Sequence, residues 1–266
     1  MVKFLIYIFL FLSTFSLLSQ EIQRDKKIEI GAFLNYSYNN HTGSLSDFSY
    51  INSCCDEFNS GGGSKFVIGF FSSYPITNQL QAQLRLNYSD ISADFIEERN
   101  TFVNLSNRVE EGSFEHSFLT SINSLGFSLY ADYNLSYEFS LLFGPSIQSV
   151  LNAEYNHQEK LVKPENKGVF TDTETRLRNA QNGDIEFLNS LLYSFDIGFS
   201  LDLPLNQKHT AFLSTELIYN IGLTSLTSDQ DWQVNAFRLG LMFKYELYKW
   251  KREQATPLKP AEEVNY

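Results

Sequence analysis

The stretch Leu-Leu-Tyr-Ser-Phe-Asp-Ile-Gly-Phe-Ser-Leu-Asp-Leu, residues 191–203, decides the fold class. Its apolar and polar side chains alternate, and a period of two sends them to opposite faces of a β-sheet. One face is bulky and aromatic, whereas the other is mostly small and includes Asp196 and Asp202. Carboxylates line the core of a soluble β-sandwich only at high cost. Apolar residues outside and small polar residues inside are typical of a transmembrane β-barrel.

Seven further segments alternate in the same way, which predicts an eight-stranded antiparallel transmembrane β-barrel of the outer-membrane type. The eight predicted strands are Ile28–Tyr38, Lys65–Tyr74, Gln79–Ala93, Ser113–Tyr133, Phe139–Leu151, Ser190–Leu203, Thr210–Thr224 and Gln233–Tyr245. Each is long enough for the roughly 9 to 11 tilted residues that cross a membrane. A soluble lipocalin-type barrel is excluded, because it would leave rows of Phe and Leu in water.

The connections between these segments alternate in length. The short ones are Pro75–Asn78, Asn134–Glu138 and Pro204–His209, and the long ones are Asn39–Ser64, Asp94–Gly112, Asn152–Asn189 and Ser225–Trp232. Outer-membrane barrels have short periplasmic turns and long extracellular loops, and an even strand count places both termini in the periplasm. Loops this long are usually functional or disordered, so we expect them to carry any specific binding, with Asn152–Asn189 the more mobile.

The two ends of the chain differ from the barrel segment. Residues 1–19 combine Lys3 with an apolar run from Phe4 to Leu18, as in an export signal peptide. Residues 20–246 are the predicted barrel, and residues 247–266 are a predicted periplasmic tail. The formal charge of −11 argues against nucleic-acid binding, and the 24 Phe and 15 Tyr residues suit a lipid-facing surface.

Two segments carry a family resemblance. The run from Phe237 to Tyr245 is similar to the closing strand of outer-membrane barrels, and Cys54-Cys55-Asp56-Glu57-Phe58 is followed by Gly61-Gly62-Gly63. Together with the short turns and aromatic strands, they resemble the PorT-like outer-membrane β-barrel proteins of Bacteroidota over about residues 28–245. The resemblance implies an outer-membrane location and, as in some relatives, membership of a secretion or envelope complex. No functional residue can be carried over from that family to this chain.

Eight charged residues are predicted to face the barrel interior. Arg85, Asp196, Glu216 and Arg238 lie at matching depths near the middle, which predicts a buried ion network that plugs the lumen. We expect Arg238 and Glu216 to interact within it. A proton or ion pathway is the alternative for the same residues. Four further charges point inward near the periplasmic rim: Glu29, Asp132, Asp202 and Lys244. We expect them to be solvated, with a cation site as the alternative.

The remaining chemistry is sparse. Cys54 and Cys55 are the only cysteines, so an intramolecular disulfide has to join adjacent residues; two free thiols in a loop are the alternative. The four histidines, His41, His116, His157 and His209, are scattered along the chain. A catalytic pair needs side chains within hydrogen-bond reach, and the sequence shows none. It therefore predicts no catalytic residue, no cofactor and no metal site.

These observations predict a non-enzymatic envelope protein that is structural or an accessory subunit of a larger outer-membrane assembly. The expected partners are outer-membrane lipids, lipopolysaccharide and other outer-membrane or periplasmic proteins. Two alternatives stay open: a narrow channel or small-solute transporter, and a surface adhesin or ligand receptor that uses the extracellular loops.

Overall fold

The protein is described by a computed structural model that covers residues 27–45, 58–105 and 108–247. Every regular element in this part of the chain is a β-strand. The strands are β1 (Glu29–Leu45), β2 (Phe58–Pro75), β3 (Leu80–Asp90), β4 (Asp94–Asn104), β5 (Val109–Asn134), β6 (Phe139–Lys163), β7 (Val169–Phe170), β8 (Leu177–Asp184), β9 (Leu191–Pro204), β10 (Ala211–Gly222) and β11 (Asp231–Glu246). None of the described residues belongs to a helix long and apolar enough to cross a membrane.

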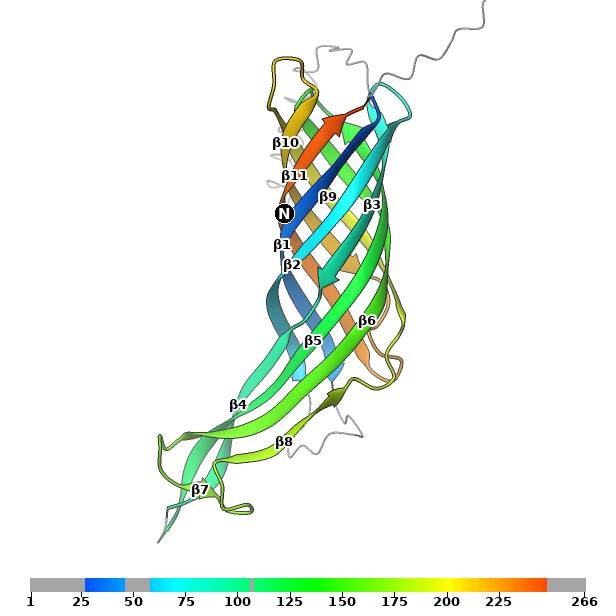
Figure 1. Ribbon diagram of the computed structural model, residues 1–266. Coiled ribbons are helices and arrows are strands. Elements are labelled where there is room, and N and C mark those ends of the chain that lie inside the picture. Colours follow the sequence, from blue (N-terminus) through cyan, green and yellow to red (C-terminus); the bar gives the residue numbers. More distant parts are fainter. Residues whose placement is uncertain (1–26, 46–57, 106–107, 248–266) are drawn as a thin grey trace, which may run out of the picture.

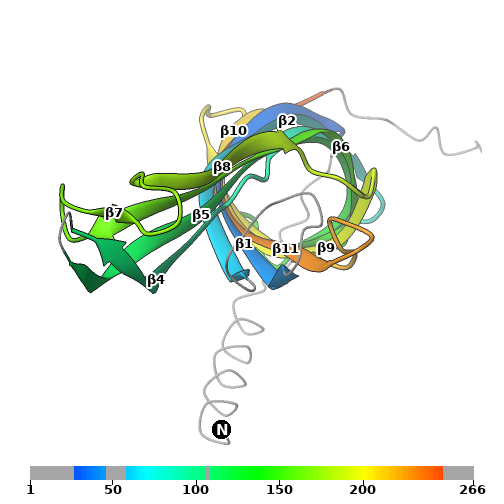
Figure 2. The same ribbon diagram turned by 90° about the horizontal axis from the view of Figure 1, so that it is seen from below.

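Antiparallel pairings link the strands into one sheet that returns on itself. The order β5-β3-β2-β1-β11-β10-β9-β6 ends where it began, because β6 also pairs with β5. Figure 2 shows these strands as a ring seen end on. Lipid offers no hydrogen-bond partners to a strand edge, so a ring satisfies the backbone of every strand within it. The predicted all-β antiparallel barrel class is confirmed.

The outer face of the ring carries an apolar band bordered by tyrosines. On β11 this face runs from Tyr245 through Leu241 to Phe237, about nine residues, which matches the span that a membrane strand needs. Tyr38 is paired with Phe237 at one border, and Ile30 is paired with Tyr245 at the other. Further exposed tyrosines at the two borders are Tyr36, Tyr74, Tyr88, Tyr133, Tyr193 and Tyr219. Aromatic girdles of this kind mark both interfaces of a membrane.

The structure corrects two predicted loops. Residues 94–104 and 109–112, together with most of Asn152–Asn189, form strands. We call this region the extension; it comprises β4, β7, β8 and the adjoining parts of β5 and β6. β3 and β4 lie end to end along β5, and β9 and β8 lie end to end along β6. The sheet therefore continues past one end of the ring, as Figure 1 shows. Residues 39–45 and 58–64, also predicted as loop, lie in β1 and β2.

A β-bulge marks the border between ring and extension. Asn123 pairs with Asn152, but Ser124 pairs with Val150, so Leu151 is the extra residue in β6. A bulge bends its strand and increases the local twist. Beyond this point, the paired strands β5 and β6 leave the wall of the ring and project to one side (Figure 2). Its outer face is polar beyond the bulge, with Glu115, Asn156 and Lys160 among its residues.

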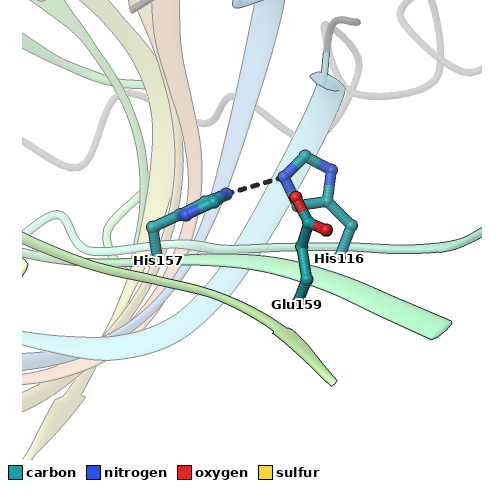
Figure 3. A group of neighbouring side chains, drawn as sticks. All are labelled: His116, His157 and Glu159. Atoms are coloured by element: carbon teal, nitrogen blue, oxygen red, sulfur yellow. Dashed lines mark hydrogen bonds between the residues drawn. The ribbon is translucent and has the colours of Figure 1, made fainter. Parts of the chain in front are cut away.

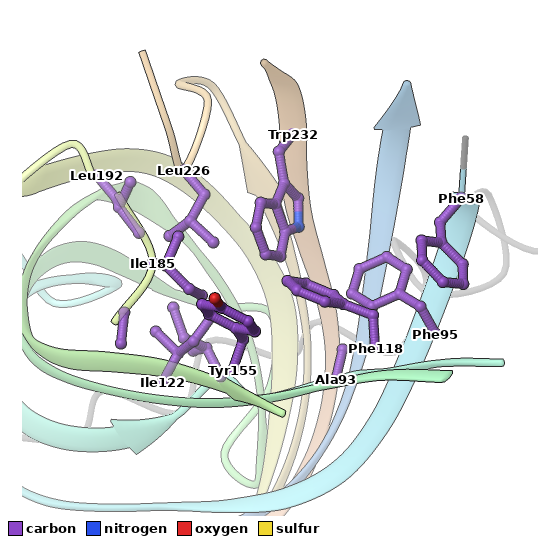
Figure 4. Close-up of a cluster of buried hydrophobic side chains, with 12 residues drawn as sticks. Phe58, Ala93, Phe95, Phe118, Ile122, Tyr155, Ile185, Leu192, Leu226 and Trp232 are labelled. Atoms are coloured by element: carbon purple, nitrogen blue, oxygen red, sulfur yellow. The ribbon is translucent and has the colours of Figure 1, made fainter. Parts of the chain in front are cut away.

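An aromatic cluster closes the ring where the extension begins. Its residues come from β2, β4, β5, β6, β9 and β11 and from the connections between strands, and they include Phe58, Phe95, Phe118, Tyr155 and Trp232 (Figure 4). The indole of Trp232 donates to Nδ1 of His41 at 2.8 Å, and Nε2 of His41 donates to the carbonyl of Ile91 at 2.8 Å. This chain of hydrogen bonds satisfies the polar atoms of a cluster that is otherwise apolar.

The lipid band generates the first prediction. Leu241 is 53% exposed at the centre of the band on β11, so an arginine there would have to lie in hydrocarbon. We expect Leu241→Arg to destabilise the protein by about 2–4 kcal/mol in lipid vesicles. Denaturant unfolding followed by tryptophan fluorescence measures this. Asn156→Arg, on the exposed outer face of the extension, is the matched control and is expected to change stability by less than about 0.5 kcal/mol. Equal effects of the two substitutions would contradict the position of the band.

Candidate functional site

The mid-barrel charges lie on four strands of the ring, and their side chains point inward. Arg85 is on β3, Asp196 on β9, Glu216 on β10 and Arg238 on β11, and all four are at most 3% exposed. An eight-stranded ring is just wide enough for side chains from opposite walls to meet. The structure therefore brings together residues that the sequence placed at one depth.

Arg85 and Glu216 form a bidentate pair across the lumen. Nη1 of Arg85 donates to Oε1 of Glu216 at 3.0 Å, and Nη2 donates to Oε2 at 2.7 Å. Asn35 donates from Nδ2 to Oε1 of the same carboxylate at 2.7 Å, while Nε of Arg85 donates to Gln83 at 2.7 Å. A bidentate contact with these additional hydrogen bonds is the geometry that a buried ion pair requires.

Asp196 has a different set of partners. It accepts hydrogen bonds from the Tyr130 hydroxyl at 2.7 Å and from Nδ2 of Asn220 at 2.6 Å, and Nη1 of Arg238 lies 4.0 Å from Oδ1. The Tyr130 ring lies 4.7 Å from the Arg85 guanidinium carbon, so Tyr130 contacts both pairs. The structure thus pairs Arg85 with Glu216 and Arg238 with Asp196, whereas the sequence led us to expect Arg238 to interact with Glu216.

Arg238 is the less tightly held of the two arginines. Its Nε has no hydrogen-bond partner among the described residues. A cavity of about 20 Å³ lies beside it, lined also by Gln148, Ser194 and Asn220. A volume of this size among polar groups accommodates a water molecule, which would complete the hydrogen bonds of the guanidinium.

The predicted rim charges are buried, which corrects the expectation of solvated groups. Glu29, Asp132, Asp202 and Lys244 are between 2% and 7% exposed. Nζ of Lys244 lies 2.8 Å from Oδ1 of Asp202, which also accepts from Ser214 at 2.6 Å. The narrow ring explains the difference, because inward side chains pack against the opposite wall even near its end.

The extension holds a third cluster, which the sequence did not predict. His116 on β5 lies beside His157 and Glu159 on β6, and all three are at most 2% exposed. Strand pairing explains this proximity, since His116 is opposite Glu159 and Phe118 is opposite His157. The Nε2 atoms of the two histidines are 2.8 Å apart. The dashed line in Figure 3 marks this hydrogen bond. We had interpreted the four histidines as scattered among loops, a strand extension and a turn; His116 and His157 are in fact neighbours, although 41 residues separate them along the chain.

Polar neighbours orient this cluster. Nδ1 of His157 donates to the carbonyl of Asn179 on β8 at 2.9 Å. Glu159 accepts from Nε of Arg178 at 2.6 Å and from Nδ2 of Asn179 at 2.9 Å. Burial and the adjacent His157 ring lower the pKa of His116 to about 4, and burial lowers the pKa of His157. Both imidazoles are therefore neutral at neutral pH.

Three predictions fall outside the described residues. These are the adjacent pair Cys54 and Cys55, the signal peptide of residues 1–19, and the tail beyond Leu247.

Comparison with known proteins identifies the family. A family model described as "Outer membrane protein beta-barrel domain" matches residues 18–228, and the chain belongs to this family. The family, together with the lipid-type outer face, indicates location in the outer membrane. No curated protein matches the chain significantly.

Several solved structures are distantly similar. The attachment invasion locus protein Ail of Yersinia pestis is 8% identical, with a TM-score of 0.37, over 83% of this chain and 100% of that chain. Neisserial surface protein A is 10% identical, with a TM-score of 0.37, over 83% and 97%. The outer membrane protease OmpT of Escherichia coli is 8% identical, with a TM-score of 0.32, over 86% and 99%. At these levels of similarity, the function has to be argued from the chain's own residues.

The two lumen pairs predict unequal effects of removing each arginine. Arg85→Met leaves the Glu216 carboxylate with Asn35 as its remaining hydrogen-bond donor among the described residues, so we expect a loss of about 3–5 kcal/mol in unfolding free energy. Arg238→Met should cost less, because Asp196 keeps its bonds from Tyr130 and Asn220. Denaturant unfolding of the folded barrel in detergent measures both values.

A double-mutant cycle tests the assignment of partners. Arg85→Met combined with Glu216→Leu should cost less than the sum of the single changes, with an interaction energy of about 0.5–3 kcal/mol. Arg238→Met combined with Glu216→Leu is the control and should be closer to additive, because no hydrogen bond or ion pair joins these two side chains in the described structure. Strict additivity of the first pair would show that Arg85 and Glu216 do not interact.

Proposed function

We propose that this protein is a non-enzymatic, non-conducting barrel that anchors a docking surface, the extension, as an accessory subunit of an outer-membrane assembly. The observation that carries the proposal is the continuation of β5 and β6 beyond the lipid band. About a dozen residues of each strand lie past the bulge, which corresponds to roughly 40 Å of strand. A structure of this length is not needed to close the ring.

The filled interior supports the non-conducting part of the proposal. The Arg85–Glu216 pair spans the middle of the ring, and the aromatic cluster that includes Phe95 and Trp232 fills one end. Further apolar residues pack inside, among them Phe33, Phe71 and Met242. An eight-stranded barrel packed in this way leaves little room for a solute.

The extension has features suited to binding another protein. β4 pairs along its length with β5, but it meets β2 only at Gly62–Asp94 and β7 only at Val103 and Asn104. A strand at the edge of a sheet is a ready template for an added strand of a partner. Ile96 and Phe102 are exposed on this strand, at 55% and 61%, and offer apolar contacts beside the edge.

The orientation follows from the lengths of the connections. The turns after β2, β5 and β9 are short and lie at the end of the ring where β1 begins and β11 ends. Short turns face the periplasm in proteins of this class. The extension then lies outside the cell, where its partner is another outer-membrane or surface protein, and both ends of the barrel segment lie in the periplasm.

Removal of the extension tests this proposal. Strand register gives the cutting points, because Asp94 is paired with Leu119 and Glu154 with Asp184. Residues 95–118 and 155–183 are each replaced by Asn-Gly, a favoured two-residue hairpin turn. We expect the variant to form a barrel that still migrates differently on gels when heated, but to lose co-purification of crosslinked partner proteins from native membranes.

Two controls make the outcome decisive. A variant with residues 206–209 replaced by Asn-Gly alters the opposite end of the barrel and should retain the partner. Conductance of the full chain in planar bilayers should be absent. Retention of the partner without the extension would overturn its role as the docking surface, and a steady single-channel conductance would favour a narrow channel instead.

A further inference from the structure

We propose that His116, His157 and Glu159 form a binding site for a divalent transition-metal ion, with Zn²⁺ as the best match. Their potential ligand atoms all lie within 4.8 Å of one another. Two imidazole nitrogens and one carboxylate oxygen are a donor set that zinc accepts, and three protein ligands leave the fourth tetrahedral position for water. Figure 3 shows the two rings converging beside the Glu159 carboxylate.

The hydrogen bonds around the cluster prepare it for a metal. Because Nδ1 of His157 donates to the Asn179 carbonyl, a neutral His157 has a lone pair on Nε2, directed at His116. Zinc-binding histidines commonly donate their second ring nitrogen to a carbonyl or carboxylate in this way. Arg178 and Asn179 likewise fix the orientation of the Glu159 carboxylate.

The protonation states require little rearrangement. In the structure, Nε2 of His116 has to donate to Nε2 of His157, so His116 carries its proton on Nε2. Metal binding moves that proton to Nδ1 of the same ring and releases no net proton from a neutral pair. With Zn–N bonds of about 2.0–2.1 Å and tetrahedral angles, the two Nε2 atoms would be about 3.3 Å apart. The rings therefore need to separate by roughly half an ångström from the 2.8 Å of the structure.

The charge balance around the cluster also favours a cation. Among the described residues, Glu159, Glu97 and Asp172 contribute three carboxylates, and Arg99 and Arg178 contribute two guanidiniums, so one negative charge is in excess in this part of the structure. Asp172 accepts from Arg178 at 2.6 Å and offsets part of the repulsion between that guanidinium and a metal. A bound ion would join β5 to β6 and, through Asn179 and Arg178, to β8. It would stiffen the extension.

Zinc binding to the purified full chain tests the proposal. The folded protein in detergent is stripped with a chelator and titrated with Zn²⁺ against a chromophoric competitor. We expect one ion per chain, and we expect His157→Ala and Glu159→Gln each to weaken binding by tenfold or more. His209→Ala is the matched control, because His209 is exposed in the turn before β10 and contacts Tyr137; it should leave binding unchanged.

A spectroscopic measurement distinguishes binding at this site from adventitious binding elsewhere. Co²⁺ substituted for Zn²⁺ should give the visible absorption bands of a tetrahedral site in the full chain and in His209→Ala, and these bands should be absent in His116→Ala/His157→Ala. Heat-modified migration on gels verifies that each variant is folded. Equal metal affinity of the full chain and His116→Ala/His157→Ala would overturn the proposal and leave the cluster as a hydrogen-bonded link between strands. Weakening by His209→Ala to the same extent would also overturn it.

Discussion

The pairing of β5 with β6 is the constraint on which the rest of the structure depends. It joins the two sides of the sheet, so that the eight strands of the ring have no open edge toward lipid. Closure with eight strands also makes the lumen narrow, and inward side chains from opposite walls must then pack against one another. Charges in such a space need partners, and this explains why Arg85 meets Glu216 in a bidentate pair and why even the rim residues Asp202 and Lys244 are buried.

The same narrowness selects small residues on the inner face. Gly240 lies on β11 beside Asn35 on β1, and a Cβ at Gly240 would collide with Oδ1 of Asn35. Asn35 in turn donates to Glu216. The glycine therefore makes room for the amide that holds the carboxylate in position for Arg85. The small polar residues on the inward face of residues 191–203 distinguished that segment from a strand of a soluble protein. Their physical role is the same: they leave space in the narrow lumen for larger inward side chains.

The strands of the ring could be predicted from the sequence because lipid imposes a strict period of two on each of them. Leu239 and Leu241 face outward and Arg238 faces inward for that reason, and all were placed correctly. The extension was missed because both of its faces border water or protein. A strand such as Leu177–Asp184 has no apolar face to reveal its period. The partner of Arg238 and the contact between His116 and His157 depend on register and rotamer across strands, which composition and spacing do not encode.

β5 and β6 belong to both the ring and the extension, and this continuity links stability with binding. In the ring, their backbone bonds are protected by lipid, and local opening there requires opening the barrel. Beyond Leu151, the same strands are held by pairing with β4 and β8, by the contacts around His116 and His157, and by a buried apolar cluster that includes Phe114 and Leu161. The bulge therefore divides the part of β5 and β6 whose opening requires opening the barrel from the part whose opening does not. For the docking surface and the metal site proposed above, this division leaves the membrane-spanning strands in register whatever the extension binds.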